Sequence, residues 1–200
     1  MTTYQHIFPT CIAADINTEF VETLTNVGDE YLKLYGSSSQ PFENHLTTYH
    51  NKKSAEMLMK DGRLLPFYDY IKKEARLYLN AMNLDDSKYK FENPFSFFAK
   101  VGDASKHDLH AHPGSVISGV YYLKVGENTP PIIFKDPREY YKYIHYKQIF
   151  GNNSAYTLLP EHAVPVHDGL IMMWPSWLEH EVPLSSSDGE RITIAFNLDK

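Results

Sequence analysis

Three histidines in this chain have the residue type and spacing of ligands to one metal ion. His110 and His112 are separated by a single residue, and His180 follows far along the chain. On a β-strand the side chains of residues i and i+2 point to the same face, so His110 and His112 can reach one ion from one strand. A third imidazole from another strand leaves coordination positions open, as catalysis at a metal requires. The three histidines therefore predict a catalytic metal centre.

A cation and a hydroxyl follow His180 at a spacing that predicts an anion site. Ten residues separate His180 from Arg191, and Thr193 lies two residues further on. Residues 191–197 alternate polar or small side chains with apolar ones, which is typical of a half-buried strand, so Arg191 and Thr193 share a face. A guanidinium binds a carboxylate through two hydrogen bonds, and a neighbouring hydroxyl adds a third. We expect this strand to hold the distal carboxylate of an organic acid whose other end chelates the metal.

The order of these motifs resembles the 2-oxoglutarate/Fe(II)-dependent dioxygenases. Their double-stranded β-helix carries His-x-Asp/Glu, a distal His and Arg-x-Ser/Thr. Over roughly the second half of the chain, the sequence is more closely similar to a family of 2-oxoglutarate-Fe(II) oxygenases from bacteria and phages. The segments that carry this resemblance are HAHPGS at 110–115, SGVYYL at 118–123, FKDPR at 134–138, PSWLEH at 175–180 and ERITIAFN at 190–197.

The resemblance implies an enzyme that binds Fe(II) and uses 2-oxoglutarate as co-substrate. It implies hydroxylation of an unidentified substrate, with succinate and CO2 as co-products. It assigns Fe(II) to the three histidines and the distal carboxylate of 2-oxoglutarate to Arg191 and Thr193. Tyr122, on a strand with Ser118 and Val120, is a further candidate for a hydrogen bond to the bound oxo-acid.

His112 departs from the wider superfamily, which usually has Asp or Glu at this position. Three neutral imidazoles leave the site with one more positive charge than two imidazoles and a carboxylate, and they suit iron, copper, nickel or zinc. The closer family shares the His-x-His form, so we interpret the site as a variant. Asp108, two residues before His110 on the predicted strand, is the alternative third ligand. Its favoured role is to orient an imidazole rather than to bind the metal.

Two other functions remain open at this point. One is a three-histidine dioxygenase of cupin type, which would bind iron and use no 2-oxoglutarate. The other is a non-catalytic jelly-roll binding module, which would bind neither iron nor 2-oxoglutarate. The order of the motifs favours the oxygenase, because a lone His-x-His pair arises easily in a chain with 10 histidines.

The pattern of apolar residues predicts a mainly β fold with N-terminal helices, in the α+β class. We expect one oxygenase domain over 1–200, with 1–88 largely helical and 89–200 forming a double-stranded β-helix, or jelly roll, buttressed by the helices. Helices are predicted where apolar residues recur at helical spacing, over 20–34 and 66–82. Strands are predicted in short apolar or aromatic runs at 95–101, 116–125, 132–134, 170–174 and 192–198.

Composition limits the partners. A formal net charge of -6 without a basic run argues against bulk nucleic-acid binding, which needs clustered Lys and Arg. Cys11 is the single cysteine, which favours a reducing cytoplasm, and no apolar run approaches the roughly 20 residues of a membrane span. A small-molecule or peptide substrate is expected, and the oligomeric state stays open. The tyrosine-rich segment 139–168 is predicted to form a wall of the substrate entrance.

Overall fold

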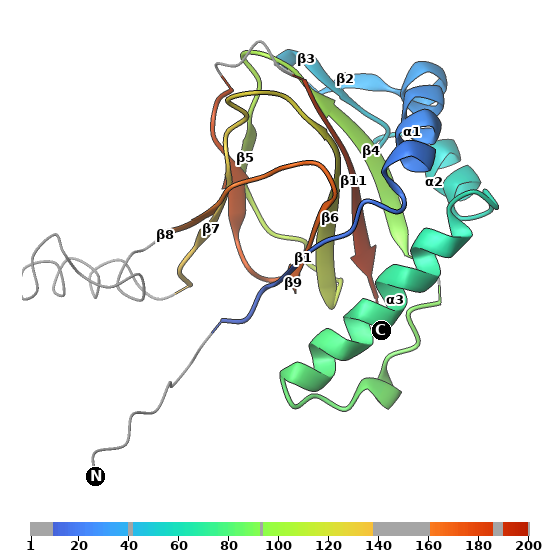
Figure 1. Ribbon diagram of the computed structural model, residues 1–200, viewed down its shortest axis with the longest axis vertical. Helices are drawn as coiled ribbons and strands as arrows, with labels where there is room; N and C mark the ends of the chain where they lie inside the picture. The colour runs from blue at the N-terminus through green and yellow to red at the C-terminus, as the bar shows by residue number, and fades with distance from the viewer. Residues whose placement is uncertain (1–9, 40–41, 93, 138–160, 186–189, 200) are drawn as a thin grey trace, which may run out of the picture.

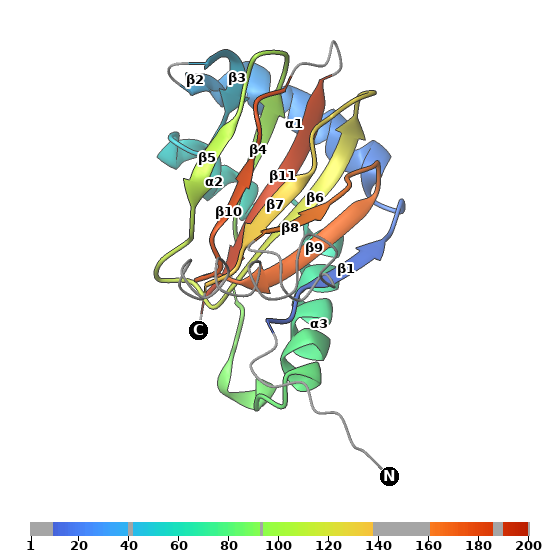
Figure 2. The same cartoon turned by 90° about the vertical axis from the view of Figure 1, so that its left-hand side faces the viewer.

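The strands of this protein form two antiparallel sheets that face each other (Figure 1, Figure 2). The computed structural model describes residues 10–39, 42–92, 94–137, 161–185 and 190–199. The larger sheet has the strand order β1-β9-β6-β11-β4-β3-β2, and the smaller has the order β5-β10-β7-β8. The strands are β1 Ala13–Ile16, β2 Ser37–Ser39, β3 Phe42–Thr47, β4 Phe95–Val101, β5 His107–His110, β6 Ile117–Val125, β7 Ile132–Lys135, β8 Glu161–Val164, β9 Leu170–Pro175, β10 His180–Val182 and β11 Arg191–Leu198.

Helices cover the outer face of the larger sheet, on the side away from the smaller sheet (Figure 1). They are α1 Val21–Tyr35, α2 Lys52–Leu58 and α3 Leu65–Ala81, followed by the short 3-10 helix η1 Asp86–Lys88. Leu24, Val27 and Tyr31 recur at helical spacing on α1 and are buried against the sheet. Pro66 lies in the first turn of α3, where its missing N–H costs nothing. The predicted jelly roll buttressed by helices is confirmed.

A second apolar core fills the space between the two sheets. In β6, Tyr121 and Leu123 pack toward the helices, whereas Val120 and Tyr122 pack toward the smaller sheet. This alternation is the period-two pattern of a strand that is buried on both faces. Met172, Trp174, Phe134 and Leu178 complete the inner core.

Strand β11 places its polar residues in this inner space. Ile192 and Ile194 belong to the core under the helices, so the alternating residues Arg191 and Thr193 point between the sheets. Both are buried despite their polarity. The predicted shared face of Arg191 and Thr193 is confirmed.

The described part of the first 88 residues contains β1, β2 and β3 as well as the helices, where the sequence predicted a largely helical segment. The segment Ala13–Ile16 becomes β1 by pairing with Leu170 to Met173 of β9, and β3 pairs with β4. Residues 13–16 read AADI and residues 42–47 read FENHLT, so neither segment has the apolar alternation that marks a strand in sequence. Their partners, rather than their own propensities, determine these strands.

Candidate metal and co-substrate site

The three predicted histidines lie together at one end of the space between the sheets. His110 ends β5, His180 begins β10, and the two are directly paired across the strands, with ring centroids 4.4 Å apart. The ring of His112 lies 5.1 Å from that of His110 and 5.2 Å from that of His180. One ring nitrogen of each histidine lies within 4.8 Å of the others. These distances allow a single ion to contact all three.

His112 lies just beyond β5, where the sequence predicted both histidines on one strand. Its backbone N–H donates to the carbonyl of Ser176 at 2.8 Å. That bond holds the chain after β5 against the turn that leads to His180. The turn therefore positions two of the three imidazoles.

Each imidazole has a partner that fixes which nitrogen carries the proton. The Nδ1 of His110 lies 2.7 Å from the carbonyl oxygen of Asp108, and the Nδ1 of His180 lies 3.0 Å from that of Leu178. A carbonyl oxygen only accepts, so both Nδ1 atoms donate and both Nε2 atoms keep a lone pair. Hydrogen bonds of this kind set the tautomer and the ring orientation of metal-binding histidines.

His112 obtains the same tautomer from a buried polar chain. Its Nδ1 lies 2.6 Å from the amide oxygen of Asn197, which also accepts from the hydroxyl of Ser118 at 2.7 Å. Ser118 in turn lies 2.8 Å from the hydroxyl of Ser176. The hydrogen bond from Ser118 identifies the Asn197 atom as the amide oxygen, and the same oxygen faces His112. Because this oxygen only accepts, Nδ1 of His112 donates to it, and His112 presents Nε2 to the other two rings.

Asp108 does not join the group as a carboxylate. Its side chain is 73% exposed and pairs with Lys106 at 2.5 Å. Its backbone carbonyl, not its carboxylate, contacts His110. The contact that orients His110 therefore comes from the backbone at position 108, which any residue would supply, and not from the carboxylate of Asp108.

Burial keeps the imidazoles of His180 and His112 neutral. Desolvation, reinforced by the nearby His110, lowers the pKa of His180 to about 3, against the hydrogen bond to Leu178, which raises it. Desolvation also lowers the pKa of His112. Neutral imidazole is the form that binds a metal ion, so the cluster is ready for a ligand at neutral pH.

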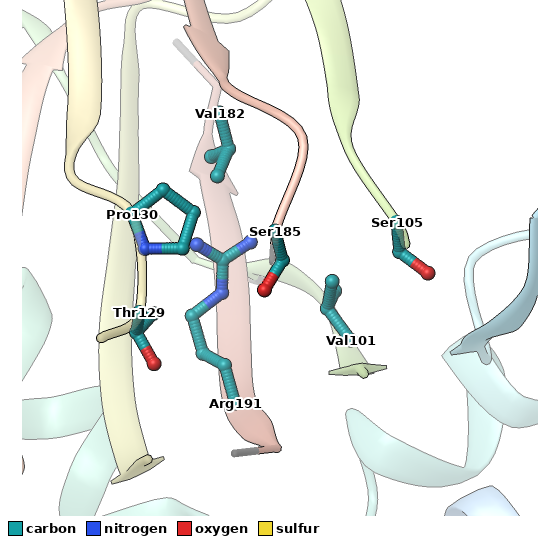
Figure 3. A pocket seen from close by; sticks show the side chains of 7 residues that line it. All are labelled: Val101, Ser105, Thr129, Pro130, Val182, Ser185 and Arg191. Atoms are coloured by element: carbon teal, nitrogen blue, oxygen red, sulfur yellow. The ribbon is translucent and has the colours of Figure 1, made fainter. Parts of the chain in front are cut away.

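Arg191 is a buried cation with unsatisfied donors. It is 4% exposed, and its Nε and Nη1 atoms have no hydrogen-bond partner. Figure 3 shows its guanidinium in a small cavity beside Val182, Pro130 and Ser185. No Asp or Glu is buried anywhere in the part of the chain that the structure describes. Since a buried charge is stable only when it is paired, we expect an anion to bind beside Arg191.

Thr193 and Tyr122 lie on the same inner wall as Arg191. They are directly opposite on β11 and β6, and both are buried. Desolvation raises the pKa of Tyr122 to about 12, with Arg191 acting in the opposite direction. Tyr122 is therefore a neutral phenol that can donate a hydrogen bond. The three residues predicted to bind the oxo-acid share one wall of the barrel.

Two further histidines, which the sequence did not single out, line the same interior. The ring of His45 lies 4.4 Å from that of His107, which lies 6.3 Å from the ring of His110. The spacing of His107 to His110 is not that of residues on one face of a regular strand. A bulge explains the difference: His107 and His110 oppose Val182 and His180, so three steps on β5 match two on β10.

The tyrosine-rich segment is described only in part. Residues 139–160 lie outside the described residues, and residues 161–164 form β8, paired with β7. Its predicted role as a wall of the substrate entrance stays a prediction. Among the described helices, none is long and apolar enough to cross a membrane.

Solved structures with a similar fold include a hydroxylase and proteins that bind or depend on 2-oxoglutarate. A prolyl-4-hydroxylase from Pseudomonas putida matches with a TM-score of 0.61 at 10% identity, covering 96% of this chain and 94% of the other. SnoK, a non-heme alpha ketoglutarate dependent carbocyclase from nogalamycin biosynthesis, matches with a TM-score of 0.60 at 12% identity over 95% and 80%. HygX from Streptomyces hygroscopicus, crystallised with nickel and 2-oxoglutarate, matches at 0.55 and 11% over 94% and 82%. Such low identities establish the double-stranded β-helix fold alone.

The family assignment comes from the sequence. No curated protein matches the chain. Residues 97–197, just over half of the 200, match the model of the family described as "Putative 2OG-Fe(II) oxygenase". The matched span contains the three clustered histidines, Tyr122, Arg191 and Thr193. The chain therefore belongs to the 2OG-Fe(II) oxygenase family, as an oxygenase that depends on Fe(II) and 2-oxoglutarate.

Proposed function

We propose that this oxygenase hydroxylates a C–H bond of a small-molecule or peptide substrate. In that reaction the substrate, 2-oxoglutarate and O2 give the hydroxylated product, succinate and CO2, so both oxygen atoms of O2 end in products. The observation that carries the proposal is Arg191, a buried cation with unpartnered donors in the same interior as three clustered imidazoles. Three imidazoles that can bind a metal, in the same interior as a cation that can bind a carboxylate, suit a metal-chelating oxo-acid.

The residues present fit a divalent metal ion. Three neutral imidazoles each direct a lone-pair Nε2 toward a common point, and all three Nδ1 atoms are bound elsewhere. His110, His112 and His180 would hold the ion as three nitrogen ligands. When bound, Fe(II) supplies the redox chemistry that couples decarboxylation of the oxo-acid to oxidation of the substrate.

The protein's own residues position the co-substrate. Arg191 would bind the distal carboxylate through two N–H groups, with the Thr193 hydroxyl as a further donor. Tyr122, a neutral phenol on the same wall, would donate to an oxygen of the oxo-acid. Phe134 and Trp174, whose rings lie 5.9 and 4.8 Å from that of His180, place apolar surface beside this imidazole and would limit the access of water to it.

Metal binding tests the histidine group. We expect His110→Ala or His180→Ala to lose stoichiometric metal while the fold remains, because each removes one of three ligands from a preformed site. Elemental analysis and circular dichroism on the same samples measure both properties. His167→Ala, which removes an exposed histidine outside the group, is the control. Full metal content in either His110→Ala or His180→Ala would contradict the assignment.

Co-substrate dependence tests the anion site. Fe(II) and 2-oxoglutarate together should raise the melting temperature more than either alone. Arg191→Ala should raise the 2-oxoglutarate concentration needed for succinate release and leave metal affinity nearly unchanged. Removal of one partner of a buried charge-assisted contact typically lowers the binding free energy by about 2–5 kcal/mol. An unchanged requirement for 2-oxoglutarate would favour a three-histidine dioxygenase of cupin type instead.

A further inference from the structure

His45 shares the interior wall with Arg191. Both residues are direct cross-strand partners of Val101: His45 on β3 from one side, and Arg191 on β11 from the other. Directly opposed residues in a sheet point to the same face, so both side chains enter the space between the sheets. Neighbouring strands lie about 4.8 Å apart, which separates the two Cα atoms by roughly 10 Å. Side chains of this length can converge on one small anion across that span.

The imidazole of His45 is buried and unsatisfied. It is 5% exposed, and neither ring nitrogen has a hydrogen-bond partner. A buried polar group without a partner is costly, and native structures contain few of them. Arg191 shows the same defect on its Nε and Nη1 atoms. Two donor groups that lack partners on one wall point to a shared acceptor.

The neighbours of His45 hold its ring in this position. His107 packs against it with ring centroids 4.4 Å apart, and His107 is the cross-strand partner of Val182. Val182 and Val101 both line the cavity of the Arg191 guanidinium. The ring of His45 thus lies between His107 of the smaller sheet and Val101 of β4, the strand that also pairs with Arg191.

We propose that His45 is a second binding residue for the distal carboxylate of the 2-oxo acid. This inference rests on the proposed function, because it takes the anion at Arg191 to be the co-substrate. A carboxylate accepts about four hydrogen bonds, more than one guanidinium edge and one hydroxyl supply. The N–H of a neutral imidazole fills a remaining acceptor site. His45 thereby helps the enzyme to select a dicarboxylic 2-oxo acid over one that ends in a methyl group.

Anaerobic calorimetric titration of the Fe(II)-loaded protein tests this selection. The probes are 2-oxoglutarate and pyruvate, which has the same metal-chelating end and no distal carboxylate. We expect His45→Phe to weaken 2-oxoglutarate binding about tenfold, the effect of losing one hydrogen bond to a charged group, and to leave pyruvate binding unchanged. His45→Gln, which keeps an N–H donor, should recover part of the loss. His162→Phe, at an exposed histidine on β8, is the control.

The outcomes separate this inference from the proposed function. Equal weakening of both acids by His45→Phe, or no weakening of either, overturns the role of His45. His45→Leu also lacks a donor and gives the same comparison if the Phe variant does not fold. Arg191→Gln is titrated in parallel. If Arg191→Gln binds 2-oxoglutarate as tightly as the parent protein does, the proposed anion site itself fails, whatever the His45 variants show.

Discussion

His112 takes the place of the carboxylate that the wider superfamily uses, and its surroundings are built for an imidazole. The amide oxygen of Asn197 accepts its Nδ1 proton and also accepts from the Ser118 hydroxyl, which in turn contacts the hydroxyl of Ser176. A carboxylate at position 112 could not accept a hydrogen bond from the amide oxygen that faces it, because that oxygen carries no proton. The polar chain behind His112 therefore matches the residue change.

Substitution at position 112 distinguishes a ligand from a neighbour. His112→Asp should still bind Fe(II), because it recreates two imidazoles and a carboxylate. His112→Ala should weaken metal binding, because two imidazoles and water hold a divalent ion less well than three protein ligands. Asp108→Ala should keep full affinity, since its carboxylate is exposed and pairs with Lys106. Metal titration of the three variants is the measurement, and a weak Asp108→Ala beside an unaffected His112→Ala would reverse the assignment.

Asn197 controls the tautomer of His112 and is expected to tune metal affinity. Residues that orient a ligand typically change metal affinity about 10- to 100-fold when mutated. We expect Asn197→Ala to weaken binding within that range and Asn197→Asp, which keeps an acceptor oxygen, to bind close to the parent. Competition with a chelator gives the affinities. Equal affinity of Asn197→Ala and the parent protein would show that the hydrogen bond has no effect on the metal.

The chemistry of single residues was predictable wherever residue type and strand period agree. Strand period predicted the shared face of Arg191 and Thr193, whereas the order of the motifs pointed to His180; the roles of these residues stay predictions. Asn197 carries the same information, since it lies four residues after Thr193 on the same strand face, but its role depends on a neighbour that folding brings to it. His45 has no such pattern, and a bulge hides His107. The periodic pattern of one strand does not show the role of a residue when that role depends on side chains from another sheet.

At the scale of elements, β11 is the strand on which the candidate site depends. Its inner face carries Arg191 and Thr193, which we propose to bind the oxo-acid, and Asn197, which contacts His112, while Ile192 and Ile194 anchor its other face under the helices. The predicted strand 192–198 and the observed β11 differ by one residue. Long apolar runs were predicted well because burial on both faces demands them, whereas β1 and β3 exist only through their partners.

Gly119 is expected to be essential for the packing of β6 beside β9 and β11. A Cβ at this position would lie 2.3 Å from Cζ of Phe196 and 2.6 Å from the backbone oxygen of Met172. Overpacking of this kind costs about 1–3 kcal/mol or more, because the backbone atom cannot move aside. Gly119→Ala should therefore lower the urea midpoint, whereas Gly62→Ala, with nothing within 4 Å, should not. Equal midpoints would mean that the strands adjust freely.

At the scale of the whole molecule, the interior between the sheets is rich in nitrogen donors and poor in acids. In the described residues the buried polar side chains include His45, His180 and Arg191 and no carboxylate. The net charge of the chain is -6, and the Asp and Glu residues whose burial the structure describes are all at least partly exposed. With acidic side chains outside and nitrogen donors inside, the barrel favours the binding of an anionic ligand.

This interior makes the metal-free protein sensitive to acid. Burial, followed by the charge of Arg191, lowers the pKa of His45 to about 4, below the value of about 6.5 in an unfolded chain. Between these values the unfolded chain binds a proton that the folded chain does not, so the free energy of unfolding falls as pH falls from about 6.5 to 4. The slope approaches about 1.4 kcal/mol per pH unit for one such group.

Urea unfolding of metal-free protein at pH 7.5, 6.0 and 5.0 measures this dependence. His45→Phe lacks the titrating group, so its free energy of unfolding should fall less steeply with acid than that of the parent. His180, with its pKa lowered to about 3, contributes in the same direction in both proteins. Parallel curves for the parent and His45→Phe would show that His45 is protonated in the folded protein.

The three-imidazole cluster also bears on which metal the protein acquires. Nitrogen ligands bind divalent ions in the order Fe(II) below Co(II), Ni(II) and Cu(II), with Zn(II) below Cu(II), and no carboxylate in this cluster shifts the preference back toward harder ions. Iron occupancy would then follow from the supply of metals during folding rather than from the strength of binding. Protein purified on a nickel resin would exchange its native ion for one that cannot support turnover, and reloading with iron would have to begin by stripping the competitor.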